Sequence, residues 1–200
     1  LDKKFQERLS DGGILSDSTG RCDNRIKEWC NFNKTGKKKV FILGDSHPEA
    51  FMRDLKKRLI QSNYEFTTMT YGACIYLKEF NRVKIKRNNI IDSGCDKTYQ
   101  KEIREKLLQN KNSIVIYTGR FSLYTTGEYF DNLEGGKEEN YKWNYRFKND
   151  DNISIEDGIK ETINELLENQ NYVILLYPIP EVGWHVPRKL LAQTISNKIF

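Results

Sequence analysis

The stretch that most constrains this chain is residues 40–51, which read Val-Phe-Ile-Leu-Gly-Asp-Ser-His-Pro-Glu-Ala-Phe. An apolar run breaks at Gly44, and a helical pattern begins at Pro48 and continues to Ile60. A strand that enters a helix through a tight turn is typical of open α/β sheets, in which ligands bind at the carboxyl ends of the strands. The rest of the chain is expected to be organised around this turn.

Ser46 is the candidate nucleophile of the turn. It lies beside the positive end of the predicted helix, and its own backbone N–H can help to stabilise an oxyanion. A structural interpretation is also open, because Ser46-His47-Pro48-Glu49 has the spacing of a capping box, with serine as N-cap and glutamate three residues later. The two interpretations are compatible.

Strand and helix patterns alternate along the chain. Strands are expected at about 39–43, 64–71, 113–118 and 172–177, and helices at about 48–60, 99–109, 154–167 and 188–200. Right-handed crossovers between parallel strands then produce a three-layer α/β/α sandwich with a central parallel sheet, similar to flavodoxin. The helices are expected to bury the apolar positions Phe51, Leu55, Leu59, Ile103, Leu107, Leu108, Ile159, Ile163, Leu166 and Leu167. A capping box, with Asp157 in place of the usual glutamate, is expected at Ser154.

Two segments depart from this alternation. Residues 77–97 are basic and are expected to be irregular, whereas residues 122–152 form an aromatic-rich excursion that contains a strand or hairpin. In the excursion, aromatic residues alternate with polar ones from Tyr141 to Phe147, which is the period of a strand. The aromatic face either covers the core or forms a wall on which sugars stack beside the active site.

Four cysteines fall into two local groups, Cys22 with Cys30 and Cys74 with Cys95. A zinc site is not expected, because the chain has no Cys-x-x-Cys pair and only two histidines. Two short-range disulfides fit these spacings and indicate an oxidising compartment, although the sequence leaves their connectivity open. The alternative is four reduced, buried thiols in a cytosolic protein.

Length and charge limit the remaining possibilities. Two hundred residues suit one domain, here divided into an extension or linker with a cysteine loop at 1–38 and the main domain at 39–200. The net charge of +5 comes from scattered residues, and the basic clusters at 37–39 and 84–87 are interpreted as solvated faces, with no nucleic-acid partner. No segment has the about 18 apolar residues of a membrane span. Because the chain starts at Leu1, we expect it to be part of a longer protein.

The ends of successive predicted strands carry the motifs of a known family. Gly44-Asp45-Ser46, Gly72 and Gly119 lie in this order at three strand ends, and residues 177–187 read Tyr-Pro-Ile-Pro-Glu-Val-Gly-Trp-His-Val-Pro. The set resembles the SGNH (GDSL-like) hydrolase superfamily, and more closely the extracytoplasmic SGNH domain fused to membrane acyltransferase-3 proteins. The resemblance extends from about Arg21 to Phe200.

The resemblance implies an O-acetyltransferase of cell-envelope glycans such as lipopolysaccharide O-antigen or peptidoglycan, without a cofactor or metal. Ser46 would be the nucleophile, and the N–H groups of Ser46 and Gly72 would line the oxyanion hole. The upstream acyltransferase-3 domain would be the partner, and it would tether this domain on the periplasmic or extracellular side of the membrane.

The chain departs from the family pattern in two blocks. The third block, Gly-x-Asn-Asp in the superfamily, is Gly119-Arg120-Phe121-Ser122 here, so Arg120 becomes a candidate oxyanion or substrate contact, together with His47 and Gly119. The structural alternatives are a salt bridge for Arg120 and packing beside the turn for His47. The catalytic Asp-x-x-His block is not found, because neither His47 nor His185 has an aspartate three residues before it. We therefore expect a domain truncated at its C-terminus, with His185 in a structural role.

Two other functions remain open. A glycan O-acetyl esterase would use the same serine with water as the acceptor. A glycan-binding or positioning module without a working triad would explain both the missing base and the aromatic excursion.

Overall fold

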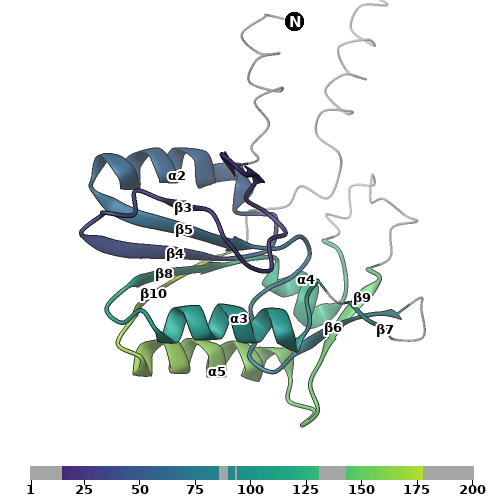
Figure 1. Ribbon diagram of the computed structural model, residues 1–200. Helices are drawn as coiled ribbons and strands as arrows, with labels where there is room; N and C mark the ends of the chain where they lie inside the picture. Colours follow the sequence, from purple (N-terminus) through teal and green to yellow (C-terminus); the bar gives the residue numbers. More distant parts are fainter. Residues whose placement is uncertain (1–14, 86–89, 93, 131–142, 178–200) are drawn as a thin grey trace, which may run out of the picture.

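A five-stranded sheet forms the centre of the protein (Figure 1). The computed structural model describes residues 15–85, 90–92, 94–130 and 143–177. The strand order is β10-β8-β4-β5-β3, and all neighbours are parallel except β3, which runs antiparallel to β5. The strands are β3 (Asn31–Phe32), β4 (Lys38–Gly44), β5 (Tyr64–Thr70), β8 (Ile114–Thr118) and β10 (Tyr172–Leu176).

Helices cover both faces of this sheet (Figure 1). One face carries α2 (Glu49–Gln61), and the other carries α3 (Lys97–Leu108) and α5 (Ile155–Glu168). Along β4, Val40 and Ile42 join the core that contains Met52 of α2, whereas Phe41 and Leu43 join the core on the opposite face. The sequence of a strand that is buried on both faces is a continuous apolar run. The predicted α/β sandwich is confirmed.

Two of the helices begin with side-chain caps. Asp96 Oδ1 accepts a hydrogen bond from Tyr99 N–H (3.0 Å) at the start of α3. At the start of α5, Ser154 Oγ accepts from Asp157 N–H (3.0 Å), which confirms the predicted cap. The predicted buried face of α5 is wrong at Leu167, which is 51% exposed. Leu166, which was also predicted to be buried, is buried, and neighbouring helical positions point about 100° apart, so the two leucines cannot share one face.

A second, three-stranded sheet contains β6 (Asn81–Lys84), β7 (Ile90–Ile91) and β9 (Tyr145–Lys148), in the order β7-β6-β9. The strand predicted in the excursion is confirmed by β9, but the prediction that residues 77–97 are irregular is wrong. In β6 the two buried residues, Arg82 and Val83, are adjacent, so the segment lacks the alternation of apolar and polar residues that reveals a strand. A short helix, α4 (Phe121–Thr126), was also not predicted.

The aromatic residues of the excursion pack against the core. Phe147 is buried, and its ring meets that of Tyr124 edge-on with 5.4 Å between centroids. The Trp143 ring lies 5.5 Å from the same tyrosine. These contacts favour the interpretation that the aromatic face covers the core, and Tyr141 lies outside the described residues.

The N-terminal segment packs beside β5. A hairpin of β1 (Ser16–Asp17) and β2 (Gly20–Arg21) leads into the loop closed by the Cys22–Cys30 disulfide. The chain then continues through Cys30, whose carbonyl accepts from Thr68 N–H (3.0 Å), into β3. A second disulfide joins Cys74 to Cys95. In each predicted cysteine group, the two cysteines are therefore bonded to each other.

We expect the two disulfides to differ in their contribution to stability. Their cysteines are separated by 8 and 21 residues, and a longer closed loop restricts the unfolded chain more. Replacing Cys74 and Cys95 together by alanine should lower the free energy of unfolding by about 3 kcal/mol, and the Cys22/Cys30 double variant should lose somewhat less. Urea denaturation measures both, and the opposite order would contradict this reasoning.

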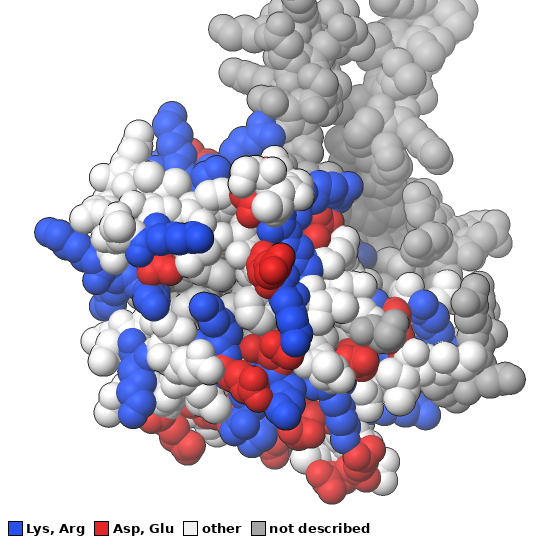
Figure 2. All heavy atoms as spheres, viewed as in Figure 1, with Lys and Arg blue, Asp and Glu red and all other residues white. Residues whose placement is uncertain are grey.

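Charged side chains of both signs are interspersed on the face that Figure 2 shows. In the basic cluster at 37–39, Lys37 is exposed and Lys38 and Lys39 are partly exposed, and the last two also contact neighbouring side chains. Lys39 Nζ donates to Asn110 Oδ1 (2.6 Å), and Lys38 Nζ lies 4.3 Å from the centroid of the Tyr172 ring.

Among the described residues, no helix combines the length and apolar character required to span a membrane.

Candidate active site at the strand ends

The carboxyl ends of β4, β5 and β8 meet at one edge of the sheet. The register pairs Gly44 with Thr70, and Tyr71 N–H continues the pairing by donating to Gly44 O (3.0 Å). A Cβ atom on Gly44 would lie only 2.2 Å from the carbonyl oxygen of Thr118, so no larger residue fits here. The glycine of the motif is therefore required by the close approach of β8.

Ser46 lies on the turn that follows β4, and it is exposed. The N-cap of α2 is Pro48, and no side chain caps this helix end, so the capping-box interpretation of Ser46 and Glu49 is wrong. The turn is closed by the backbone instead, because Glu49 N–H donates to Ser46 O (3.1 Å). The Ser46 hydroxyl makes no hydrogen bond to another residue of the described part, and it is available to a ligand.

Asp45 joins the turn to the elements around it. This carboxylate is only 1% exposed. Its Oδ1 accepts from His47 N–H (2.8 Å), and its Oδ2 accepts from Arg120 N–H (2.9 Å) and from the Tyr124 hydroxyl (2.5 Å). Burial and the neighbouring Asp45 carboxylate hold the pKa of Tyr124 well above its ordinary value, so the hydroxyl remains a donor. Asp45 thereby connects the Ser46 turn to the start of α4.

Gly72 N–H, the second predicted oxyanion donor, carries a hydrogen bond. It donates to the side-chain Oδ1 of Asn24 (2.7 Å). Asn24 belongs to the Cys22–Cys30 loop, and its own N–H donates to Thr70 O (3.0 Å) at the end of β5. Because Gly44 pairs with Thr70, Ser46 and Gly72 lie two residues beyond paired positions on adjacent strands. The Asn24 amide oxygen is therefore bound at the same edge of the sheet as the candidate nucleophile.

Glu49 contributes a second carboxyl group at the start of α2. Burial is the largest cause that raises its pKa above the ordinary value, followed by the charge of Asp23, while Arg21 acts in the opposite direction. Its Oε1 is buried and has no hydrogen-bond partner among the described residues. The edge around Ser46 thus combines a buried, hydrogen-bonded Asp45 with a partly buried Glu49 of raised pKa.

The other predicted site residues lie around the same edge. Gly119 packs against Asp45, since a Cβ atom there would lie 3.4 Å from Asp45 Oδ2 and 2.6 Å from Ile75 Cγ2. The backbone N–H of Arg120 donates a hydrogen bond to Asp45, while the Arg120 guanidinium lies 5.1 Å from the centroid of the Tyr129 ring. His185 lies outside the described residues.

Sequence reasoning missed two partners in this site. Tyr124 follows Arg120 by four residues, a helical spacing, but the segment showed no helical pattern long enough to predict α4. Asn24 had no signal at all, because only the folded disulfide loop brings it next to Gly72.

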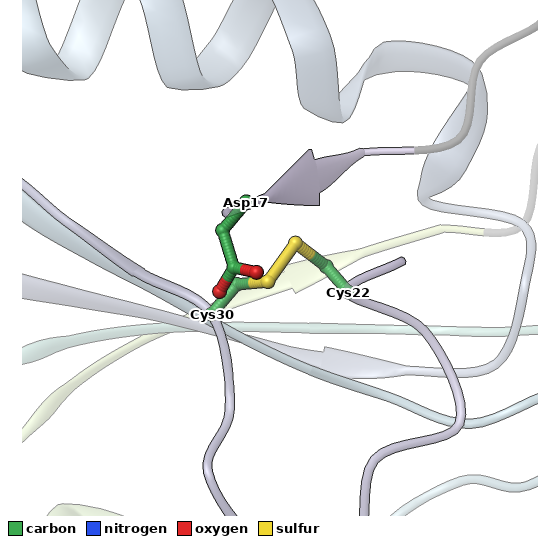
Figure 3. Close-up of side chains that lie close together, drawn as sticks. All are labelled: Asp17, Cys22 and Cys30. Carbon is green, nitrogen blue, oxygen red and sulfur yellow. A yellow bond between two sulfur atoms is a disulfide. The ribbon is translucent and has the colours of Figure 1, made fainter. Parts of the chain in front are cut away.

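One group of possible metal ligands occurs in the described part of the chain, and it does not suit a metal. The ligand atoms of Asp17, Cys22 and Cys30 lie within 4.8 Å of one another. Figure 3 shows, however, that the two sulfur atoms are joined in a disulfide, and metals bind cysteine as the thiolate. Asp17 is bound by Arg25, whose Nη2 donates to Asp17 Oδ1 (2.8 Å). Hydrogen bonds from Arg25 and then Thr19 hold the Asp17 pKa well below its ordinary value.

Comparison with known proteins identifies the family of the chain. No curated protein and no solved structure shows a match to the chain. The model of one family, described as "SGNH domain (fused to AT3 domains)", matches residues 16–199. That match spans the whole described sheet, the Ser46 turn and both disulfides. The chain therefore belongs to the family of SGNH domains that are fused to AT3 domains.

Proposed function

We propose that this chain is the acyl-transferring domain of an envelope O-acetyltransferase, with Ser46 as the nucleophile. The observation that carries the proposal is the exposed Ser46 hydroxyl on a turn held by buried Asp45, where three strand ends meet. The acceptor is a hydroxyl group of a cell-envelope glycan such as O-antigen or peptidoglycan. An AT3 membrane domain supplies the acetyl group, and the two disulfides are compatible with a position outside the cytoplasm.

The reaction has two steps. Ser46 Oγ attacks the carbonyl carbon of the acetyl donor, its proton passes to a base, and the donor group leaves with a proton. A sugar hydroxyl then attacks the acetyl-serine, and Ser46 recovers its proton as the acetyl ester of the glycan forms. A serine hydroxyl needs a base for the first step. Within this sequence the candidates for the base are His47, whose backbone N–H donates to Asp45 Oδ1, and His185, and a histidine of the missing Asp-x-x-His block is the alternative.

Each step passes through a tetrahedral oxyanion, which requires donors that are already in place. We assign these to the N–H groups of Ser46 and Gly72. In the structure, Asn24 Oδ1 accepts the hydrogen bond of the Gly72 N–H. The acyl oxygen therefore takes the place of this amide oxygen when the donor binds.

The Asn24 contact also favours a second candidate, a glycan-binding or positioning module. A side chain that permanently satisfies the Gly72 N–H would leave the site without its second oxyanion donor. An esterase is the third candidate, because water can replace the sugar in the second step.

A labelling experiment separates the serine enzymes from the binding module. Treatment with a fluorophosphonate, followed by mass spectrometry, should give one adduct on Ser46 that is absent from Ser46→Ala. Glycan binding without any adduct, in the natural full-length protein, would favour the module. Supplying labelled acetyl donor and an excess of glycan to the same protein then separates the two enzymes, because an esterase releases free acetate and a transferase labels the glycan.

The Asn24 contact gives a prediction of its own. Asn24→Gly removes the competing amide oxygen and suits the positive φ of this residue, 59°. One hydrogen bond is worth about 0.5–1.5 kcal/mol, so kcat/KM for an acetate ester should rise about 2- to 10-fold. The matched control is Asn33→Gly, since Asn33 also has a positive φ, 54°, but bonds Tyr64 O instead. A fall in kcat/KM for Asn24→Gly alone would show that Asn24 supports the site rather than occupying it.

A further inference from the structure

Arg82 is a buried cation that binds the turn carrying Gly72. It is 3% exposed and comes from β6, outside the main sheet. Its Nη1 donates to the carbonyl oxygens of Gly72 (2.6 Å) and Ala73 (2.7 Å), and its Nη2 donates to Asp92 Oδ2 (2.6 Å). A buried arginine is costly unless it is paired and hydrogen-bonded. Here both terminal nitrogens of the guanidinium are hydrogen-bonded, whereas Nε has no partner among the described residues.

Aromatic rings and an anion hold this guanidinium in place. It lies 4.6 Å from the centroid of the Tyr145 ring and 5.5 Å from that of Tyr71, within the range of cation–π attraction. Burial tends to raise the pKa of Asp92, but the charges and hydrogen bonds of Arg82 and Lys84 outweigh it and leave that pKa below its ordinary value. The ion pair is therefore intact at neutral pH.

The turn that Arg82 binds is also fixed at both of its ends. Ala73 adopts a left-handed conformation with a φ of 56°, which is unfavourable for a residue with a Cβ atom. Cys74 N–H donates to Tyr71 O (2.9 Å), and Cys74 is tied to Cys95 by the disulfide. Between Tyr71 and Cys74, the carbonyl oxygens of Gly72 and Ala73 both accept hydrogen bonds from Arg82.

We propose that Arg82 is a positioning residue for the oxyanion site: by holding the Gly72 and Ala73 carbonyls it orients the turn so that Gly72 N–H faces the reacting acyl oxygen. This inference rests on the proposed function, because it concerns the same Gly72 donor. It also gives the second sheet a role, since β6 carries Arg82 and β9 carries Tyr145.

The planar guanidinium matters as much as the charge. A lysine at position 82 would keep the charge, but as a single point with flexible donors it does not reproduce the fork that reaches two carbonyls and a carboxylate. A small displacement of a catalytic group can cost about 100-fold in rate. Arg82→Lys should therefore lower kcat for an acetate ester about 10- to 100-fold, with little change in KM.

The experiment measures p-nitrophenyl acetate turnover and the fluorophosphonate labelling rate of Ser46 in the natural full-length protein, together with its melting temperature. Arg104→Lys is the matched control, because Arg104 donates to Glu165 (2.5 Å) between α3 and α5 and does not contact the turn. This control should lose stability but keep its kcat. A parallel fall in kcat and labelling rate is expected for Arg82→Lys alone.

Asp92→Asn provides a second variant that keeps Arg82 but weakens its anchor, in case Arg82→Lys does not fold. We expect a smaller fall in kcat, about 3- to 10-fold. The proposal is overturned if a folded Arg82 variant, or Asp92→Asn when Arg82→Lys does not fold, retains the wild-type kcat while turnover still requires Ser46. If wild-type turnover does not require Ser46, the proposed function itself has failed.

Discussion

Replacing Ser46 by alanine is expected to abolish the proposed acetyl transfer, with kcat falling at least about 1,000-fold, because no other hydroxyl occupies the turn between β4 and α2. Stability should change little, since the Ser46 side chain is exposed and makes no hydrogen bond within the described residues. The measurement is transfer of labelled acetyl to glycan by the natural full-length protein, with the melting temperature recorded in parallel.

Ser62→Ala is the matched control for this substitution. Ser62 is also exposed, but it lies at the opposite end of α2, where its backbone N–H caps the helix. Unchanged transfer by Ser46→Ala would exclude the acetyl-serine intermediate. Loss of transfer in both variants would point to a general defect in folding or export.

Asp45→Ala should have the second large effect, because it damages both the site and the fold. The substitution leaves the Tyr124 hydroxyl and the N–H groups of His47 and Arg120 without their acceptor. Buried groups that lose a charged partner cost free energy, so we expect the free energy of unfolding to fall by about 2–4 kcal/mol. Activity should fall at least about 100-fold, because the Ser46 turn loses its anchor on α4. Urea denaturation and ester turnover measure the two effects.

Two variants separate the contributions of Asp45. Tyr124→Phe removes a single buried hydroxyl and should cost about 1 kcal/mol with a moderate loss of activity. Asp54→Ala removes an aspartate whose side chain is 64% exposed and paired with Arg58, so it should change neither quantity measurably. A fully active Asp45→Ala variant would contradict the role assigned to this carboxylate.

The candidate site depends on parts of the chain that lie outside the main parallel sheet. The Cys22–Cys30 loop places Asn24 against Gly72 on one side, and the second sheet places Arg82 against the carbonyls of the same turn. The segment from Tyr71 to Cys74 is thus bound on two sides, by Asn24 and by Arg82.

The sequence by itself determined the four parallel strands of the main sheet, because β4, β8 and β10 are apolar runs and β5 is rich in aromatic and β-branched residues. It did not predict the antiparallel edge strand β3, which has only two residues. The Gly44-Asp45-Ser46 motif is also a local property, since the steric need for glycine and the start of α2 arise within a few residues. Both cysteine pairs were predicted for the same reason, because each bridge closes a short loop.

Only the tertiary structure decided which groups share the site with Ser46. Asn24 lies 48 residues before the Gly72 that it binds, and Tyr124 lies 79 residues after Asp45. Arg82 is a charged residue in a segment without a strand pattern, and its burial is possible only because Asp92 and two carbonyls surround it after folding. Such contacts depend on the packing of distant segments, and no local periodicity encodes them.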